Sequence, residues 1–310
     1  MIYCNKIVEK GERLMKYLES FMLASESDEV DYILGFNRRL GKMDMQCYSR
    51  TNVYPFKIFP NKGLDRLNFE PITIIYGGNG SGKSTLLNLI AEKLRLERSA
   101  PFNNTPFIEE YLKFCKCELT FGRSVPRESK IVTSDEVFDS LLDVRAINEG
   151  VDRRREELFA EYDSLRGEKF LLRNFDDLDE FKKRNEAKRR TKSNYVSKRL
   201  PKEIDGMSNG ETAYFYFTKE IGENALYLLD EPENSLSATL QNKLRGFIED
   251  SARFYGCQFI IATHSPFLLS MKGAKVYDLD SVPVAAKKWT ELENVRTYFD
   301  FFEEHRDEFK

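Results

Sequence analysis

The chain has 310 residues, of which 41% are hydrophobic and 32% are charged, and its formal net charge is −3. These values are typical of one large or two small water-soluble domains, and they exclude a uniformly basic surface for nucleic acid. No apolar run approaches the ~20 residues that span a bilayer, and the first residues lack the apolar core of a signal peptide. We therefore expect a cytoplasmic protein with no membrane partner.

The first 46 residues contain no chemical motif and are interpreted as a helical extension. Apolar side chains at helical spacing predict a helix at residues 12–22, and a second helix is expected at 30–40. Residues 47–69 favour short antiparallel strands with a turn at 60–63. Three aromatic side chains in this stretch could stack on a base, although core packing explains each more simply: Tyr54, Phe56 and Phe59.

Residues 77–84 read Gly-Gly-Asn-Gly-Ser-Gly-Lys-Ser, which satisfies the phosphate-binding-loop pattern G-x-x-x-x-G-K-[ST]. Glycines let backbone N–H groups turn toward phosphate oxygens, while Lys83 reaches the β- and γ-phosphates and the Ser84 hydroxyl holds Mg²⁺. An apolar strand at 71–76 precedes the loop and a helix at 84–96 follows it, as the motif requires. The nucleotide-binding candidates are Gly77, Gly78, Asn79, Gly80, Ser81, Gly82, Lys83, Ser84 and Thr85.

Residues 134–205 predict a charged helical insertion, and no sustained heptad repeat indicates a long coiled coil. The stretch 181–202 contains ten lysines and arginines. Phosphate contacts need only such cations, so DNA or RNA contact is one interpretation of this stretch. A solvated helix, or one paired with the acidic residues 176–180, is the other interpretation. The candidate contact residues are Lys188, Arg189, Arg190 and Lys192.

Strands are expected at 225–229, 258–262 and 276–279, and a helix at 236–251. The first of these strands leads into Asp230 and Glu231, at the strand end where open α/β sheets bind ligands. Asp230 is a candidate for holding Mg²⁺, and Glu231 for orienting the attacking water; a simple Asp-Glu-Pro turn is the alternative. The second leads to His264, which could donate to a γ-phosphate or to water, or could be structural.

The motifs at 77–84, 207–211, 229–232 and 263–266 occur in the order and spacing of an ABC-type ATPase, and the chain resembles that family. Within it, the chain looks like the soluble SMC/RecF/OLD-like group and the compact bacterial proteins labelled AAA-family ATPases. Residues 234–237 look like the family's D-loop. The stretch that resembles the family's signature motif is Ser208, Asn209, Gly210 and Glu211. A Ser followed three residues later by Glu is also a helix-capping box, and both interpretations can hold together.

The resemblance implies an α/β fold, namely a P-loop NTPase with an ABC-type ATPase head, a helical insertion and short antiparallel strands. It divides the chain into an extension (1–46), a nucleotide-binding lobe (47–133), the insertion (134–205), a signature, Walker B and His-switch segment (206–285) and a C-terminal helix (286–310). That last helix is expected to pack four side chains inward: Val295, Tyr298, Phe301 and Phe302.

The resemblance also implies ATP and Mg²⁺ as cofactors and a head-to-tail homodimer. ATP on the loop of one copy is closed by Ser208 and Gly210 of the other, Glu231 acts on water, and His264 senses the γ-phosphate. The family usually has a Gln between the loop and the signature, and this chain has none between Ser84 and Ser208. Ser134 and Asp135, after a strand-like run at 130–133, are the candidates to replace it.

We therefore expect an ATP-hydrolysing switch that acts on nucleic acid or on a separate effector protein, in genome maintenance or anti-phage defence. Two alternatives stay open at this point. The chain could be the motor subunit of an ABC transporter, against which the missing coupling Gln argues, or an ATP-gated scaffold that does not hydrolyse ATP.

Overall fold

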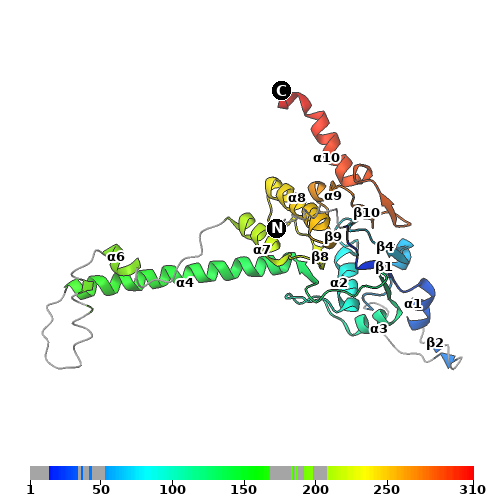
Figure 1. Ribbon diagram of the computed structural model, residues 1–310, viewed down its shortest axis with the longest axis horizontal. Coiled ribbons are helices and arrows are strands. Elements are labelled where there is room, and N and C mark those ends of the chain that lie inside the picture. Colours follow the sequence, from blue (N-terminus) through cyan, green and yellow to red (C-terminus); the bar gives the residue numbers. More distant parts are fainter. Residues whose placement is uncertain are drawn as a thin grey trace, which may run out of the picture. The chain divides into compact units, whose positions relative to one another are not determined.

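The computed structural model describes residues 14–33, 36–37, 42–43, 53–167, 183, 186–187, 192–197 and 208–310. It divides into two compact units, one formed by residues 1–137 with 209–310 and the other by residues 138–208 (Figure 1). No helix within the described residues is long and apolar enough to cross a bilayer. The division of the first unit into lobes stays a prediction.

A six-stranded sheet forms the centre of the first unit, with the strand order β11-β10-β5-β9-β8-β7. All neighbouring strands from β10 to β7 run parallel, and β11 pairs antiparallel with β10 at the edge. The strands β5 and β9 are buried at every position, because a parallel sheet is covered on both faces. The bounds are β5 Ile72–Tyr76, β7 Lys130–Thr133, β8 Leu226–Asp230, β9 Gln258–Ala262, β10 Lys275–Asp278 and β11 Ala285–Lys287.

Helices of the first unit flank this sheet, with α2 against β7, β8 and β9 and α8 against β9. Their apolar residues recur at helical spacing, so one face of each is buried. The bounds are α1 Glu26–Ile33, α2 Lys83–Leu94, α3 Pro106–Phe114, α7 Asn209–Glu220, α8 Ala238–Phe254, α9 Pro266–Leu269 and α10 Glu293–Glu304. Short 3-10 helices lie at η1 Pro60–Lys62, η3 Trp289–Glu291 and η4 Arg306–Phe309.

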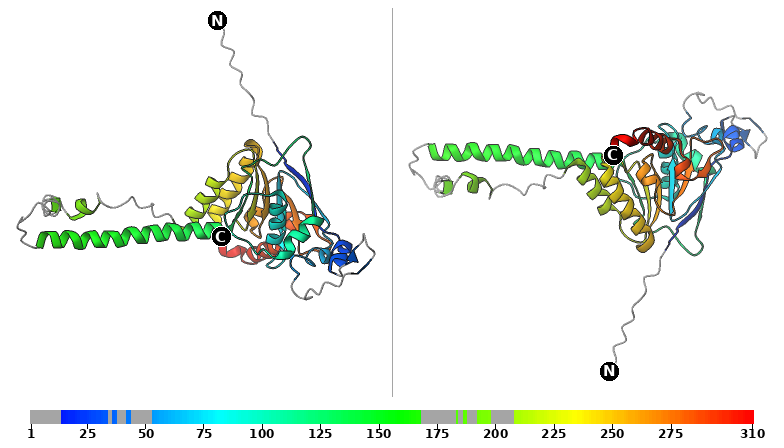
Figure 2. Two further views of the ribbon diagram at one scale, coloured as in Figure 1. Left: turned by 90° about the horizontal axis from the view of Figure 1, so that it is seen from below. Right: turned by 90° about the horizontal axis from the view of Figure 1, so that it is seen from above.

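A second, antiparallel sheet has the order β4-β1-β6, with bounds β1 Leu18–Met22, β4 Arg66–Asn68 and β6 Lys116–Leu119 (Figure 2). The predicted helix at 12–22 is therefore wrong at 18–22. Leu18 and Phe21 are fully buried, but they face the core from the middle strand of a sheet. The side chain of Gln258 joins this sheet to β9. Its Oε1 accepts from the N–H groups of Tyr17 at 2.7 Å and Leu18 at 2.9 Å, and its Nε2 donates to the carbonyls of Leu18 and Glu70.

Two further expectations for the N-terminal third need correction. The helix expected at 30–40 is α1 at Glu26–Ile33, followed by the two-residue strands β2 Phe36–Asn37 and β3 Lys42–Met43. The described residues from 53 to 65 form turns rather than strands, and within the described residues 53–69 the one strand is β4. The expected turn at 60–63 is η1, which ends at Gly63 with a φ of 59°.

The second unit contains most of α4 Ser134–Gly167 and the short α6 Lys192–Ser197. The expected helical character is confirmed for these residues. A small apolar cluster holds the unit together: Leu158, Tyr162, Leu165, Ala187, Tyr195 and Val196. Lys192 forms an ion pair with Asp163 at 2.5 Å and lies 5.0 Å from the ring centre of Phe159. The other candidate nucleic-acid contacts, Lys188, Arg189 and Arg190, lie outside the described residues.

The C-terminal helix α10 forms within the expected range, but its aromatic side chains are not packed inward as predicted. Val295 is buried, whereas Tyr298, Phe301 and Phe302 are 46%, 53% and 53% exposed. The amphipathic pattern indicates an apolar face, and the described part of the chain covers only the start of that face.

Candidate nucleotide-binding site

The glycine-rich loop joins the end of β5 to the start of α2, as the motif requires. A Cβ at Gly77 would lie 2.5 Å from Ser81 Oγ, so no larger residue fits there without a shift of the loop. Gly82 has a φ of 98°, and a Cβ there would also press on Ile58 at 3.1 Å. The loop leads directly into the first turn of α2, whose N–H groups have no intrahelical partner. Such a helix N-terminus binds anions.

Lys83 is the first residue of α2, and its side chain is only 4% exposed. Its ammonium donates to the carbonyl oxygens of Gly77 at 2.8 Å and Gly78 at 3.1 Å. It also lies 3.6 Å from Glu231 Oε1. A buried cation needs such partners. Its position over the loop places a positive charge beside the N–H groups of α2.

Ser84 and Asp230 come together from α2 and β8, with the Ser84 hydroxyl donating to Asp230 Oδ1 at 3.1 Å. Burial raises the pKa of Asp230 to about 6; the Ser84 hydrogen bond opposes this rise, and the Glu231 charge adds to it. Mg²⁺ prefers carboxylate and hydroxyl oxygens, and it usually takes one or two protein ligands with waters and phosphate oxygens. A desolvated carboxylate beside a second carboxylate and a hydroxyl fits such a cation.

Glu231 follows Asp230 with a φ of 47°, in the left-handed region that non-glycine residues seldom adopt. Its N–H donates to the Ala262 carbonyl at 2.9 Å, which fixes the turn to the neighbouring strand β9. Asn234 Nδ2 donates to Glu231 Oε2 at 3.2 Å. The Glu231 carboxylate lies between Lys83 and His264, with Oε1 3.6 Å from Lys83 Nζ and 3.9 Å from His264 Nδ1. Backbone strain such as that at Glu231 is concentrated at functional sites.

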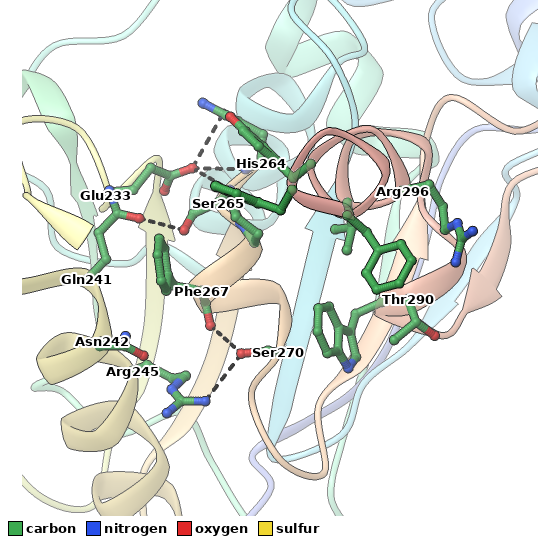
Figure 3. Close-up of a pocket in the computed structure, with 16 residues that line it drawn as sticks. Glu233, Gln241, Asn242, Arg245, His264, Ser265, Phe267, Ser270, Thr290 and Arg296 are labelled. Atoms are coloured by element: carbon green, nitrogen blue, oxygen red, sulfur yellow. Dashed lines mark hydrogen bonds and ion pairs between the residues drawn. The ribbon is translucent and has the colours of Figure 1, made fainter. Parts of the chain in front are cut away.

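Glu233 is a functional candidate that the sequence analysis missed. Its side chain is 5% exposed, and Oε1 accepts from Thr263 Oγ1 at 2.6 Å. Oε1 also accepts from His264 N at 2.9 Å and Ser265 N at 3.2 Å (Figure 3). The His264 ring is half-exposed, and its Nδ1 lies 3.9 Å from Glu231 Oε1. Asn294 Nδ2 also donates to the His264 carbonyl at 2.9 Å. The His264 backbone is thus held from two sides.

One cavity of about 460 Å³ joins several of these elements. Ser84, Thr85, Asp230 and Glu231 line it, together with Tyr54, Asn88, Pro101, Phe102, Asn103, Thr133, Ser134 and Asp135. Tyr54 donates to Thr85 Oγ1 at 3.0 Å. Phe56 and Phe59 are buried in the core instead, so Tyr54 is the one of the three aromatic candidates that lines this cavity.

The end of β7 supplies an additional polar group to this cavity. Thr133 pairs in register with Asp230 of β8, and its hydroxyl is buried without a hydrogen-bond partner among the described residues. Ser134 and Asp135, the predicted replacements for the missing Gln, line the same cavity. The candidates named from the sequence begin one residue after Thr133, although a hydroxyl at the end of a strand beside the acidic strand was a usable signal.

Comparison with known families explains this arrangement. The model of the ABC transporter family matches residues 66–234, which is more than half of the chain. The chain belongs to the ABC ATPase family. It carries an ABC-type ATP-binding domain on a P-loop α/β fold. Residues 203–270 also match a family described as an AAA domain and a candidate AbiEii toxin of a type IV toxin–antitoxin system. No curated protein matches the sequence.

Solved ABC ATPase and SMC head structures are similar to this chain at low identity. The SMC head domain from Thermotoga maritima is 15% identical, with 88% of this chain and 98% of that one covered and a TM-score of 0.38. A dimeric bacterial ABC transporter cassette is 14% identical, covering 74% and 91%, with a TM-score of 0.37. An SMC head bound to the C-terminal winged-helix domain of ScpA is 17% identical, covering 75% and 94%, with a TM-score of 0.35.

The first turn of α7, which carries most of the signature segment of this ABC ATPase, is not part of the lining of this cavity. Asn209, Gly210 and Glu211 form the first turn of α7. A Cβ at Gly210 would meet Leu240 Cδ1 at 3.0 Å and the Ser235 carbonyl at 3.1 Å, so this turn packs against α8 and the segment before it. Neither Ser208 nor these residues are among those that line the described cavity beside the loop.

Proposed function

We propose that this chain is an ATPase that binds ATP with Mg²⁺ and uses ATP to join two copies head to tail. The observation that carries the proposal is the cavity shared by Ser84, Asp230 and Glu231, with the Lys83 ammonium 3.6 Å from Glu231 Oε1. A cation that can bind phosphate, oxygen atoms that can bind a metal ion and a carboxylate that can orient water thus lie close together.

In the proposed reaction, the N–H groups of the loop and of the first turn of α2 bind the phosphates. Lys83 exchanges the loop carbonyls for phosphate oxygens. Ser84 and Asp230 hold Mg²⁺, which when bound neutralises charge on the phosphates. Glu231 orients the attacking water, and His264, held by Glu233, contacts the γ-phosphate or that water.

The second copy supplies the signature segment in this proposal. ABC-type sites are closed in trans, and Ser208 and Gly210 are the residues that would close the ATP of the partner copy. The position of α7 outside the cavity supports a site that is completed by a second chain rather than by the first.

Mixing two inactive variants tests this arrangement directly. Lys83→Ala removes the phosphate cation from both sites of a homodimer, and Ser208→Arg blocks both signatures. A mixed pair has one site with both defects and one intact site. Since half of random pairs are mixed, we expect up to roughly a quarter of wild-type ATPase activity on mixing. No gain on mixing, with both variants folded, would contradict closure in trans.

A second measurement separates hydrolysis from binding. In Glu231→Gln, ATP binding should persist while turnover falls, so ATP should drive a stable dimer that gel filtration with light scattering detects. A monomer at saturating ATP would refute the ATP-joined dimer. Turnover that is negligible in the wild type and unchanged in the variant would favour the non-hydrolysing scaffold. A co-purifying permease would favour the transporter motor.

We further propose that the closed pair acts on nucleic acid or on a separate effector protein in the cytoplasm, in genome maintenance or anti-phage defence, as a member of the soluble SMC/RecF/OLD-like group. The match to a family described by a toxin–antitoxin system supports such a role. Replacing Lys188, Arg189, Arg190 and Lys192 by alanine should abolish salt-sensitive DNA retention and leave ATP binding unchanged. Absence of retention by the wild type at low salt would eliminate the nucleic-acid role.

A further inference from the structure

A second and larger cavity, of about 770 Å³, lies between α8, α9 and the segment formed by η3 and α10. Figure 3 shows Gln241, Asn242 and Arg245 on one side of it and Thr290 and Arg296 on the other. Its inner end reaches Glu233 and His264, next to the proposed catalytic centre. Its apolar lining consists of Pro266, Phe267, Trp289, Val295, Tyr298, Phe299 and Phe302. We call this cavity the α10 groove.

The aromatic lining of the α10 groove continues onto exposed surface along α10 and η4. Six aromatic side chains here are between 38% and 73% exposed: Trp289, Tyr298, Phe299, Phe301, Phe302 and Phe309. At about 200 Å² for a fully exposed aromatic side chain, they leave roughly 600 Å² uncovered. Exposed apolar surface of this extent marks an interaction site.

The groove and the far end of α10 carry opposite charges. Arg245 Nε is buried without a hydrogen-bond partner among the described residues, and Nη1 donates weakly to Ser270 Oγ at 3.3 Å. Glu233, the carboxylate in the lining, already accepts three hydrogen bonds. By contrast, residues 300–308 contain five carboxylates and one arginine, interleaved with Phe301 and Phe302. The far end of α10 is therefore both aromatic and acidic.

We propose that the α10 groove receives α10 of a second copy of this chain, so that two copies pair through their C-terminal segments without nucleotide. In a two-fold arrangement each acidic, aromatic end enters the groove of the other copy and faces Arg245. Covering both sets of aromatic side chains removes about 1,200 Å², which reaches the lower limit of a specific interface. This pairing goes beyond the proposed ATP-joined dimer, because ATP takes no part in it.

For the proposed function, pairing at α10 would keep the nucleotide sites of two copies near each other. Where one pair of copies can form both contacts, pairing at α10 raises the effective concentration at which ATP joins their nucleotide sites. The groove ends at His264, so the second copy's helix would lie beside a proposed catalytic residue. The pairing thus connects C-terminal association with the site.

The fluorescence of Trp289 measures occupancy of the groove, because this is the one tryptophan in the chain. With nucleotide removed, dilution from ~50 μM to ~0.1 μM should convert dimer to monomer and shift the tryptophan emission to longer wavelength, as a buried indole becomes hydrated. Sedimentation velocity on the same samples should show the same transition. A nucleotide-free monomer at every concentration, with emission independent of dilution, would overturn the proposal.

Phe302→Glu places a charge on the exposed aromatic stripe and should raise the dissociation constant at least tenfold. Phe254→Glu is the matched control, because Phe254 is 42% exposed at the end of α8 and does not line the groove. The dimer should persist in the control. A nucleotide-free dimer that survives Phe302→Glu would show that another surface holds it.

A charge exchange distinguishes specific pairing from a loss of folding. Glu304 is exposed and forms no ion pair within the described part of the chain. Arg245→Glu and Glu304→Arg should each weaken the nucleotide-free dimer, and the double variant should recover most of the loss. Failure to recover, with all variants folded, would refute the predicted contact between the acidic end and the groove. A dimer that forms only with ATP would overturn this inference and leave the proposed function intact. A nucleotide-free dimer that does not respond to ATP would support this inference and contradict the proposed ATP-joined dimer.

Discussion

Replacing Asp230 by asparagine should stabilise the Mg²⁺-free fold at neutral pH. The carboxyl group lies at the end of β8 against Ser84 and Glu231, and burial raises its pKa to about 6. In the unfolded chain an aspartate titrates near ~3.9. The folded state therefore binds this proton more tightly than the unfolded state does. Asparagine keeps the shape and the hydrogen bond and removes the charge.

The direction and the size of the stability change follow from the difference between the folded and unfolded pKa values of Asp230. The protonated carboxyl contributes its stability fully below about pH 4, and that contribution is lost as pH rises through about 6. A shift of about 2 pH units at ~1.4 kcal/mol per unit gives an upper limit of about 3 kcal/mol. The gain from Asp230→Asn should therefore be close to zero at pH 4 and reach up to about 3 kcal/mol above pH 7.

Urea denaturation of both proteins in EDTA, from pH 4 to pH 8, measures this difference. Asp250→Asn is the control, because Asp250 is exposed on α8 and a surface change of this kind is worth within about 0.5 kcal/mol. A gain that is the same at pH 4 and pH 8 would contradict the electrostatic explanation. So would a loss of stability at pH 8. Adding Mg²⁺ with ATP should reduce or reverse the gain, since only the wild type has the second metal ligand.

Three further outcomes follow from the site. Glu233→Ala leaves Thr263 Oγ1 and His264 N without their acceptor, while Ser265 N keeps Thr263 Oγ1. The change should lower the free energy of unfolding by roughly 2–5 kcal/mol, whereas Glu233→Gln should lose less, as thermal or urea denaturation will show. Gly77→Ala should abolish nucleotide binding in a titration with a fluorescent ATP analogue, because its Cβ would meet Ser81 Oγ at 2.5 Å. Gly78→Ala should retain more binding, because its Cβ would lie in ordinary contact with Asp280 Oδ2 at 3.6 Å. Thr133→Val should raise the Mg²⁺ concentration needed for ATP binding, and Thr133→Ser should restore it; equal Mg²⁺ requirements in all three proteins would remove this hydroxyl from the metal site.

The central sheet could be predicted because its buried strands are runs of consecutive, mostly apolar residues. The stretch 258–262 was expected as a strand and is β9 with the same bounds, and the run before the loop is β5. Both strands are covered on two faces, so nearly every position is apolar. The motifs that carry the family resemblance follow these strands directly, and that resemblance implied the fold.

The strand β1 could not be predicted from local pattern. Leu14, Tyr17, Leu18 and Phe21 recur at helical spacing, but the partners of β1 are β4 and β6, far along the chain. Pairing on both edges overrides a weak local preference. The aromatic side chains of α10 show a second limit of prediction from sequence. A pattern shows that a helix face is apolar, but it does not show which chain covers that face.

Glu233 was missed because its role depends on two neighbouring strands. The residue follows β8, and the donors that it satisfies follow β9. An acidic residue three positions after a predicted metal carboxylate, beside a strand that ends in Thr263, His264 and Ser265, was the available signal. It becomes informative only once the two strands are known to be adjacent.

The side chain of Gln258 has a consequence for how the N-terminus can be altered. Both hydrogens of its amide and both lone pairs of its oxygen are committed, to Leu18, Tyr17 and Glu70. A one-residue slip of β1 would turn its apolar side chains to the opposite face and break this set at the same time. The amide therefore helps to fix the register of β1, so a one-residue insertion or deletion within β1 should lose its apolar packing and these hydrogen bonds together.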